Sequence, residues 1–100
     1  MSDEGLTLLT GLRHLTHLSI RHCKVSDAVL VCFKDCQELR ELDLQGTAVT
    51  DAGVARLASF SKLQYVNLTQ TAVTETGVKK LATALPKCKV EWNGGVLEPR

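Results

Sequence analysis

Histidine and cysteine residues gather in one short stretch of the sequence, where their side chains could bind a metal ion. His14, His17, His22 and Cys23 crowd one predicted strand and the turn that follows it. A zinc site needs three or four such groups that converge in a closed geometry. Because neighbouring strand positions point to opposite faces of a sheet, we expect His17 outside, Cys23 inside the turn and the other two histidines on either side. These directions diverge, so we predict no metal site.

Two carboxylates on another predicted strand could serve as an acid–base pair. Glu41 and Asp43 occupy alternate positions, which places them on one face about 7 Å apart at the backbone. Such chemistry also needs a cleft that excludes water, and we interpret the pair as a solvated acidic strip. A cysteine–histidine nucleophile pair is disfavoured because the helix side and the strand side face opposite ways. We therefore predict no catalytic residue, no cofactor and no enzymatic activity.

The four cysteines are expected to be free thiols. Residues 1–10 carry Asp3 and Glu4 in place of a positively charged flank, so no secretory signal is predicted. The expected location is therefore the cytoplasm, where thiols stay reduced. Cys32 and Cys36 lie four residues apart on a predicted helix, which is a poor frame for a disulfide.

The elements that position these residues repeat every 24 residues. The segments LTHLSIRHCKVSD from Leu15, LRELDLQGTAVTD from Leu39 and LQYVNLTQTAVTE from Leu63 align without gaps. Self-similarity at a fixed period of this length is typical of stacked repeat architectures. We therefore predict a single domain with a half repeat (1–14), three repeats (15–38, 39–62 and 63–86) and a terminal half repeat (87–100).

Each repeat combines a strand with a helix. Apolar residues at alternate positions, such as Leu42 and Leu44, predict a short half-buried strand, and the spacing of Val54 and Leu57 predicts a helix. Since one unit cannot cover its apolar face, neighbouring repeats must stack, with parallel strands on one side and helices on the other. Two further columns are expected in the core: Val25, Val49, Val73 and Leu97, and Leu12, Cys36, Phe60 and Ala84.

Hydroxyl and glycine residues mark the start of each predicted helix. The hydroxyl residues are Ser2, Ser26, Thr50 and Thr74, and glycines follow three residues later at Gly5, Gly53 and Gly77. A side-chain oxygen can accept a hydrogen bond from a first-turn amide, so the hydroxyl residues are interpreted as N-caps. Glycine weakens a helix, so we interpret the glycines as places where the backbone packs closely against the neighbouring repeat.

The pattern LxxLxL followed by Cys or Thr and then by VTDAGV resembles the leucine-rich repeat, specifically its cysteine-containing subclass. F-box substrate receptors and GALA-type bacterial effectors contain that subclass, and ALPKCKVEW resembles the closing repeat of such proteins in planctomycete-type bacteria. The resemblance implies an α/β solenoid with a parallel sheet on the concave side and helices on the convex side. The cysteine column reads Cys23, Thr47, Thr71 and Gly95. In the turns, Cys23, Thr47 and Thr71 are expected to donate hydrogen bonds to the backbone.

Residues that alternate with the buried leucines are predicted to form a binding surface on the concave face. They are His17, Ser19, Arg21, Glu41, Asp43, Gln45, Tyr65, Asn67, Thr69 and Glu91. Tyr65 is the best candidate for an energetically dominant contact, since aromatic residues contribute much of the energy of interfaces, and Glu41 is expected beside it as an acceptor. We therefore predict a protein partner, bound without catalysis.

Composition narrows the class of partner. The chain has 100 residues, 44% of them hydrophobic, and a formal net charge of +1. A domain with this small net charge is not expected to bind nucleic acid, because proteins that do so usually carry a basic surface. No apolar run is long enough to span a membrane. The alternative function, implied by the resemblance, is substrate recognition within an F-box-type ubiquitin ligase or a bacterial effector.

The first predicted strand, Leu18–Ile20, has no partner on its outer side in this sequence. Because an open strand edge invites pairing, we expect one of two situations. Either the chain is part of a longer array, or it associates with itself through this N-terminal edge.

Overall fold

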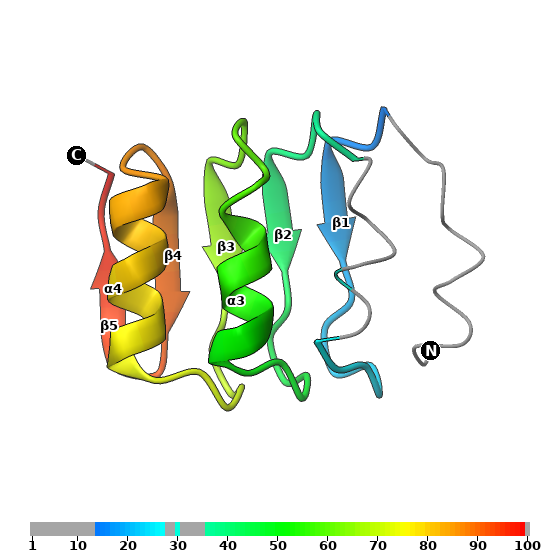
Figure 1. The fold of residues 1–100 in the computed structure, drawn as a ribbon. Coiled ribbons are helices and arrows are strands. Elements are labelled where there is room, and N and C mark those ends of the chain that lie inside the picture. Colours follow the sequence, from blue (N-terminus) through cyan, green and yellow to red (C-terminus); the bar gives the residue numbers. More distant parts are fainter. Residues whose placement is uncertain (1–13, 28–29, 31–35, 100) are drawn as a thin grey trace.

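The computed structural model describes residues 14–27, 30 and 36–99, which form a sheet with helices on one face (Figure 1). The sheet has five strands in sequence order. They are β1 (His17–Ser19), β2 (Glu41–Asp43), β3 (Tyr65–Asn67), β4 (Lys89–Trp92) and β5 (Gly95–Leu97). The helices α3 (Asp51–Leu57) and α4 (Glu75–Ala84) lie side by side along the sheet.

Strand pairing follows the repeat period. His17 pairs with Glu41, Glu41 with Tyr65 and Tyr65 with Lys89, all in parallel strands. Each step is 24 residues, so the register of the sheet confirms the period read from the sequence. The predicted architecture of parallel strands covered on one side by helices is also confirmed.

The core lies between the sheet and the helices. Leu42, Val66 and Val90 occupy the same position of successive strands and are at most 1% exposed. Val54 and Val78 reach them from the helical side and are equally buried. Because this apolar layer continues from repeat to repeat, stacking buries a surface that a single repeat would expose.

Two aspartates tie consecutive repeats together at the starts of the helices. Asp27 accepts two hydrogen bonds from Thr50, one from the backbone N–H at 2.7 Å and one from the hydroxyl at 2.5 Å. Asp51 accepts the same pair from Thr74, at 2.8 Å and 2.5 Å. The carboxylate of one repeat therefore fixes the backbone where the next helix begins.

These aspartates explain the glycines in the first helical turns. A Cβ atom added to Gly53 would lie 2.1 Å from Oδ1 of Asp27, and one added to Gly77 would lie 2.2 Å from Oδ1 of Asp51. The expectation of close packing against the neighbouring repeat is confirmed, with a side-chain carboxylate as the neighbour. Gly5 lies outside the described residues.

The N-cap expectation holds in part. The Thr50 hydroxyl accepts a hydrogen bond from the N–H of Ala52 at 3.3 Å, as predicted. Thr74 occupies the N-cap position of α4 but makes no side-chain cap hydrogen bond. Ser2 and most of the helix expected after Ser26 lie outside the described residues.

In the cysteine column, the side chains of Cys23, Thr47 and Thr71 donate hydrogen bonds to the backbone of the turns, as expected. Cys23 Sγ donates to the carbonyl of Arg21 at 3.6 Å, and the Thr47 hydroxyl donates to the carbonyl of Leu44 at 2.7 Å. Thr71 repeats the contact on the carbonyl of Leu68 at 2.6 Å. The two hydroxyls thus satisfy equivalent backbone acceptors three residues back, whereas the thiol bonds the carbonyl two residues back.

The terminal half repeat departs from the predicted pattern. Leu97 was expected in the core column of Val25, Val49 and Val73, but it belongs to β5, which runs antiparallel to β4 and pairs Leu97 with Val90. The physical reason is the Gly94–Gly95 pair, since Gly95 has a φ of 134° and permits a tight reversal of the chain. The sheet therefore ends in an antiparallel hairpin.

A second departure shifts the core residues after α4. Ala84 was expected in the core column of Phe60, but it is exposed, and Leu85 is buried in its place. The cause is the length of α4, which continues to Ala84, whereas α3 already ends at Leu57. Leu12 of this column lies outside the described residues.

Two described cysteines belong to the core. Cys36 is buried, as expected, and so is Cys88. Burial raises the pKa of the Cys88 thiol to about 11, which keeps it protonated and unreactive at neutral pH. Cys32 lies outside the described residues.

In the part of the chain that the structure describes, no helix is both long enough and apolar enough to cross a lipid bilayer.

Candidate functional site

The concave face is the side of the sheet opposite the helices, formed by the side chains that alternate with the buried strand residues. On β2, for example, Leu42 points into the core while Glu41 is exposed and Asp43 is partly exposed. Hydrogen bonds between parallel strands place equivalent side chains about 4.8 Å apart. The structure thus brings the predicted surface residues together in three adjoining columns.

Basic and acidic side chains face each other along β1, the turn after it, and β2. The imidazole Nε2 of His17 contacts Oε2 of Glu41, and the Arg21 Nε lies 3.3 Å from Oδ2 of Asp43. The Thr16 hydroxyl lies 2.9 Å from Nδ1 of His17 and orients the ring. Each carboxylate therefore has a basic neighbour on the adjacent strand. This pairing stabilises a charged surface and leaves neither acid placed to share a proton with the other.

Tyr65 lies at the centre of this face and is partly buried. It is opposite Glu41 in the strand register, as predicted, but its hydroxyl hydrogen-bonds to Glu91 on the other side. The expectation that Glu41 is the acceptor is wrong, because Glu41 pairs with His17. Burial, followed by the bond to Glu91, raises the pKa of Tyr65 to about 12. The phenol is therefore neutral at physiological pH, and its ring is held in place.

Three of the predicted surface residues are bonded mainly to one another. Asn67 is 8% exposed, and its Nδ2 donates to Oε1 of Gln45 at 3.2 Å. Its Oδ1 accepts hydrogen bonds from the N–H and the hydroxyl of Thr69, at 3.0 Å and 2.7 Å. Asn67 therefore positions Gln45 and Thr69 and presents little of its own amide to a partner. The remaining predicted residue on β1, Ser19, is exposed.

The face is hollowed near its first strands. A groove of about 360 Å³ is lined by side chains that include His17, Ser19, Glu41, Asp43 and Tyr65. Its lining joins an aromatic ring to a histidine–glutamate contact and a second carboxylate, a mixture that is common in protein–protein interfaces. The groove therefore offers a partner aromatic, hydroxyl and acidic or basic side chains on one continuous surface.

Sequence reasoning missed one exposed apolar residue next to this surface. Val96 on β5 is 46% exposed and lies opposite Glu91 in the antiparallel register. Directly opposite residues in a sheet share a face, so Val96 extends the concave face beyond β4. The dipeptide Asn93–Gly94, between the paired residues Trp92 and Gly95, is a hairpin signal, and it could have identified this position.

The histidines near Cys23 serve other contacts. Nδ1 of His14 lies 2.7 Å from Oε2 of Glu38, and this hydrogen bond lowers the pKa of that carboxyl. The ring of His22 lies so close to Gly46 that an added Cβ atom would be 2.2 Å from its Nδ1. Within residues 14–27, 30 and 36–99, no group of three or more histidine, cysteine or acidic side chains could hold a metal ion.

Comparison with known proteins agrees with this architecture. A family model described as Leucine Rich repeat matches residues 11–33 and 35–58. Among solved structures, an internalin from Listeria monocytogenes superposes with a TM-score of 0.60 at 18% sequence identity. The match covers 88% of this chain and 31% of the internalin chain, so the chain spans less than a third of that structure. No curated protein sequence matches the chain significantly.

Proposed function

We propose that this leucine-rich-repeat solenoid is a protein-interaction module that binds a protein partner through its concave face. The observation that carries the proposal is the setting of Tyr65, a partly buried aromatic ring between paired charges on one side and Glu91 with Val96 on the other. Leucine-rich repeats and other solenoids use extended surfaces of this kind for binding.

Tyr65 is suited to anchor a partner. Tyrosine contributes a large contact area at a low cost in side-chain entropy, and it is enriched among the dominant contacts of interfaces. The bond to Glu91 fixes the ring before binding, which reduces the entropy lost on association. The contacts of His17 with Glu41 and of Arg21 with Asp43 then supply a polar rim on one side, and Val96 supplies apolar area on the other.

The same arrangement favours binding over catalysis. Glu41 and Asp43 are each in contact with a basic side chain. We accordingly propose a non-enzymatic scaffold. We expect neither nucleic acid nor a membrane as its target, because the net charge of the chain is only +1.

Affinity capture from the lysate of the source cell tests the proposal. The baits are the wild-type chain, a Glu41→Ala, Asp43→Ala, Tyr65→Ala triple variant, and a matched helical-face triple variant, Arg56→Ala, Lys62→Ala, Lys79→Ala. Circular dichroism first establishes that all three are folded. We expect partners that are lost with the concave triple variant and kept with the helical one. Partners that survive the concave substitutions would refute the proposed face.

A second candidate is substrate recognition within an F-box-type ubiquitin ligase or a bacterial effector. It is supported by the turns after successive strands, where the Cys23 thiol, like the hydroxyls of Thr47 and Thr71, donates to a nearby backbone carbonyl, in keeping with the cysteine-containing subclass. The complete reading frame that encodes the chain decides between the two. An F-box or effector segment in that frame supports the second candidate.

Self-association through the N-terminal edge is a further part of the proposal. Within the described residues, β1 pairs with β2 and with no other strand, so its outer edge is the expected place for a second copy. Sedimentation equilibrium over a range of concentrations tests this, since a monomer at all concentrations would argue against it.

We also propose that the protein works in the cytoplasm. The described thiols Cys23 and Cys88 fill structural positions, in a turn and in the core, which is compatible with a reducing compartment. Fluorescence microscopy of the tagged chain in the source cell tests this location.

A further inference from the structure

The turn between β4 and β5 contains the dipeptide Asn93–Gly94, and both residues are exposed. The paired residues of the two strands end at Trp92 and Gly95, so the N–H of Gly94 lies in the turn and outside the ladder. A bond between Cγ of an asparagine and the main-chain nitrogen of the next residue closes a five-membered ring, and glycine adds no side chain that would hinder this closure. The turn therefore holds a nucleophile beside a carbonyl carbon, separated only by rotations about the bonds of Asn93.

The packing of Trp92 requires glycine at position 94. A Cβ atom added to Gly94 would lie 2.5 Å from Cζ2 of the indole ring. Trp92 packs against the hydrophobic core, so a larger residue at position 94 would displace a side chain that covers part of the core. The fold therefore retains the one residue type that leaves the Asn93 amide unhindered.

The N–H of Gln70, in the turn after β3, donates to Oδ1 of Asn93 at 2.7 Å. Gln70 has a φ of 58°, a conformation that is uncommon for residues other than glycine. In the turn after β1, His22 has a φ of 57° and donates to the main-chain carbonyl of Gln45 at 2.8 Å. After β3 the direction of the donor is kept, but the acceptor is the side-chain carbonyl of Asn93.

This donor is placed on the oxygen where negative charge develops if Cγ of Asn93 is attacked. The carbonyl oxygen then becomes an oxyanion, and a main-chain N–H aimed at it beforehand stabilises the transition state. Nδ2, the leaving group of such a reaction, donates to the carbonyl of Thr71 at 3.3 Å. The two bonds fix the plane of the amide, so main-chain groups of the preceding repeat hold Asn93 as an oxyanion site holds an acyl group.

We propose that Asn93 is a site of spontaneous deamidation in the folded protein. The Gly94 nitrogen gives its proton to water and forms a bond to Cγ of Asn93. The bond from Cγ to Nδ2 breaks, and Nδ2 takes up a proton and leaves as ammonia. Water then opens the resulting succinimide at either of its carbonyls, which gives aspartate or isoaspartate. The overall reaction consumes one water molecule, releases one ammonia molecule and needs no oxidant or cofactor.

Both products change the end of the sheet. Either one replaces a neutral amide by a carboxylate two residues from Glu91 and removes the Nδ2 donor that bonds Thr71. Isoaspartate also adds a methylene group to the main chain of the turn, which disturbs the pairing of Trp92 with Gly95. Neither change requires that the concave face binds a partner.

Mass spectrometry of the incubated protein tests the proposal. The folded wild type, an Asn93→Gln variant and an unstructured synthetic peptide of residues 87–100 are incubated at neutral and at alkaline pH. Trypsin then releases residues 90–100 from the protein, and an unincubated sample corrects for conversion during digestion. Glutamine is the matched substitution, because it keeps the amide but must close a larger ring that forms more slowly. Circular dichroism verifies that the variant is folded.

Asn67 is an internal control in every sample, because Asn67 and Asn93 are the two asparagines of the sequence. It is 8% exposed, and the N–H that follows it, that of Leu68, donates to the carbonyl of Glu91 at 2.7 Å. This nitrogen is therefore committed to the sheet. Trypsin releases Asn67 in a separate peptide, residues 63–79.

We expect residues 90–100 of the folded wild type to gain the mass that replaces an NH₂ group by OH. The gain should be faster at alkaline pH, because the Gly94 nitrogen must lose its proton. The folded chain should convert at least as fast as the peptide, since Gln70 donates to Oδ1 only in the folded chain.

A folded chain that converts more slowly than the peptide, or not at all, would overturn the proposal, because the bonds to Gln70 and Thr71 would then protect the amide. Equal conversion at Asn67, or in the Asn93→Gln variant, would likewise overturn it.

Discussion

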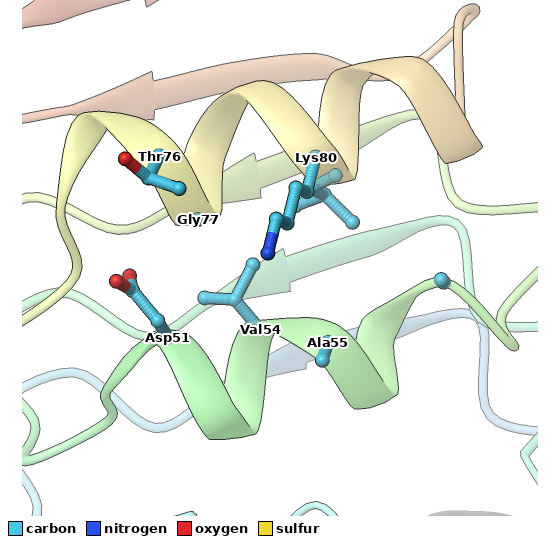
Figure 2. A pocket seen from close by; sticks show the side chains of 8 residues that line it. Asp51, Val54, Ala55, Thr76, Gly77 and Lys80 are labelled. Carbon is cyan, nitrogen blue, oxygen red and sulfur yellow. The ribbon is translucent and has the colours of Figure 1, made fainter.

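The carboxylate of Asp51 holds Thr74 by two hydrogen bonds, to its backbone N–H at 2.8 Å and to its hydroxyl at 2.5 Å. This contact joins the helix of one repeat to the start of the helix in the next. The carboxylate also packs against Gly77, because Oδ1 of Asp51 occupies the space where a side chain at that position would begin (Figure 2). One carboxylate thus accounts for the position of Thr74 before α4, for a glycine and for the spacing of two repeats.

Gly77→Ala should destabilise the protein even though alanine is the better helix former. The new Cβ atom would lie 2.2 Å from Oδ1 of Asp51, so the carboxylate must move and lose its bonds to Thr74. We expect a loss of about 1–3 kcal/mol in the free energy of unfolding, measured in urea. Thr76→Ala, a neighbouring exposed position in the same helix, is the control and should change stability by less than about 0.5 kcal/mol.

The double variant Asp51→Ala, Gly77→Ala separates the clash from other effects. Without the carboxylate, alanine at position 77 should be neutral or should stabilise α4 by up to about 1 kcal/mol relative to Asp51→Ala alone. If Gly77→Ala costs the same in both backgrounds, the carboxylate is not the reason for the glycine.

Asp51 should also contribute a pH-dependent part of the stability. Its pKa is lowered from 3.8, mainly because Thr74 donates hydrogen bonds to the charged form. A lowered pKa in the folded state means that the contribution is complete above pH 3.8 and is lost as the pH falls below that value. The measurement is the urea midpoint of the wild type and of Asp51→Asn at neutral and at acidic pH. The gap between the two proteins should narrow on acidification, and a constant gap would contradict the assignment.

The ionisation of Tyr65 can be followed directly, since it is the one tyrosine of the sequence. Its pKa of about 12 should appear in a titration of tyrosinate absorbance. Glu91→Gln removes a nearby negative charge that opposes ionisation, so the pKa should fall. It should stay above 10.0, because burial is the larger cause of the shift. Glu98→Gln, an exposed acid near the chain end, serves as the control and should leave the curve in place.

Leu44→Ala tests the repeat register. Leu44 is fully buried at the end of β2, and truncation of a buried leucine costs about 2–5 kcal/mol. Gln64→Ala, at an exposed position just before β3, should change stability by less than about 0.5 kcal/mol. Urea unfolding of both variants is the measurement. A leucine variant as stable as the wild type would mean that the side chain is not in the core.

The 24-residue period of the sequence predicted the register of the strands. It predicted fewer of the contacts between residues at different positions of the repeat. Leu42 and Val66 recur 24 residues apart, and this spacing fixed the strand register correctly. The Asp51–Thr74 bond joins residues 23 apart on different columns, so no single column revealed it. Likewise, Tyr65 has neighbours on both sides at equal strand spacing. Periodicity alone could not tell that His17 engages Glu41 and leaves Glu91 as the acceptor.

The aspartate bonds also determine how the array can be lengthened. A tandem copy of residues 39–62 would bring its own Thr50 to meet the aspartate before it, and its own Asp51 to meet the threonine after it. Each inserted unit would therefore find a complete docking site on both sides, and the hairpin of β4 and β5 would still close the sheet. Insertions of other lengths would leave a carboxylate without its threonine. The protein is thus extensible in whole units of 24 residues, a modular property that engineering can use to enlarge the binding surface.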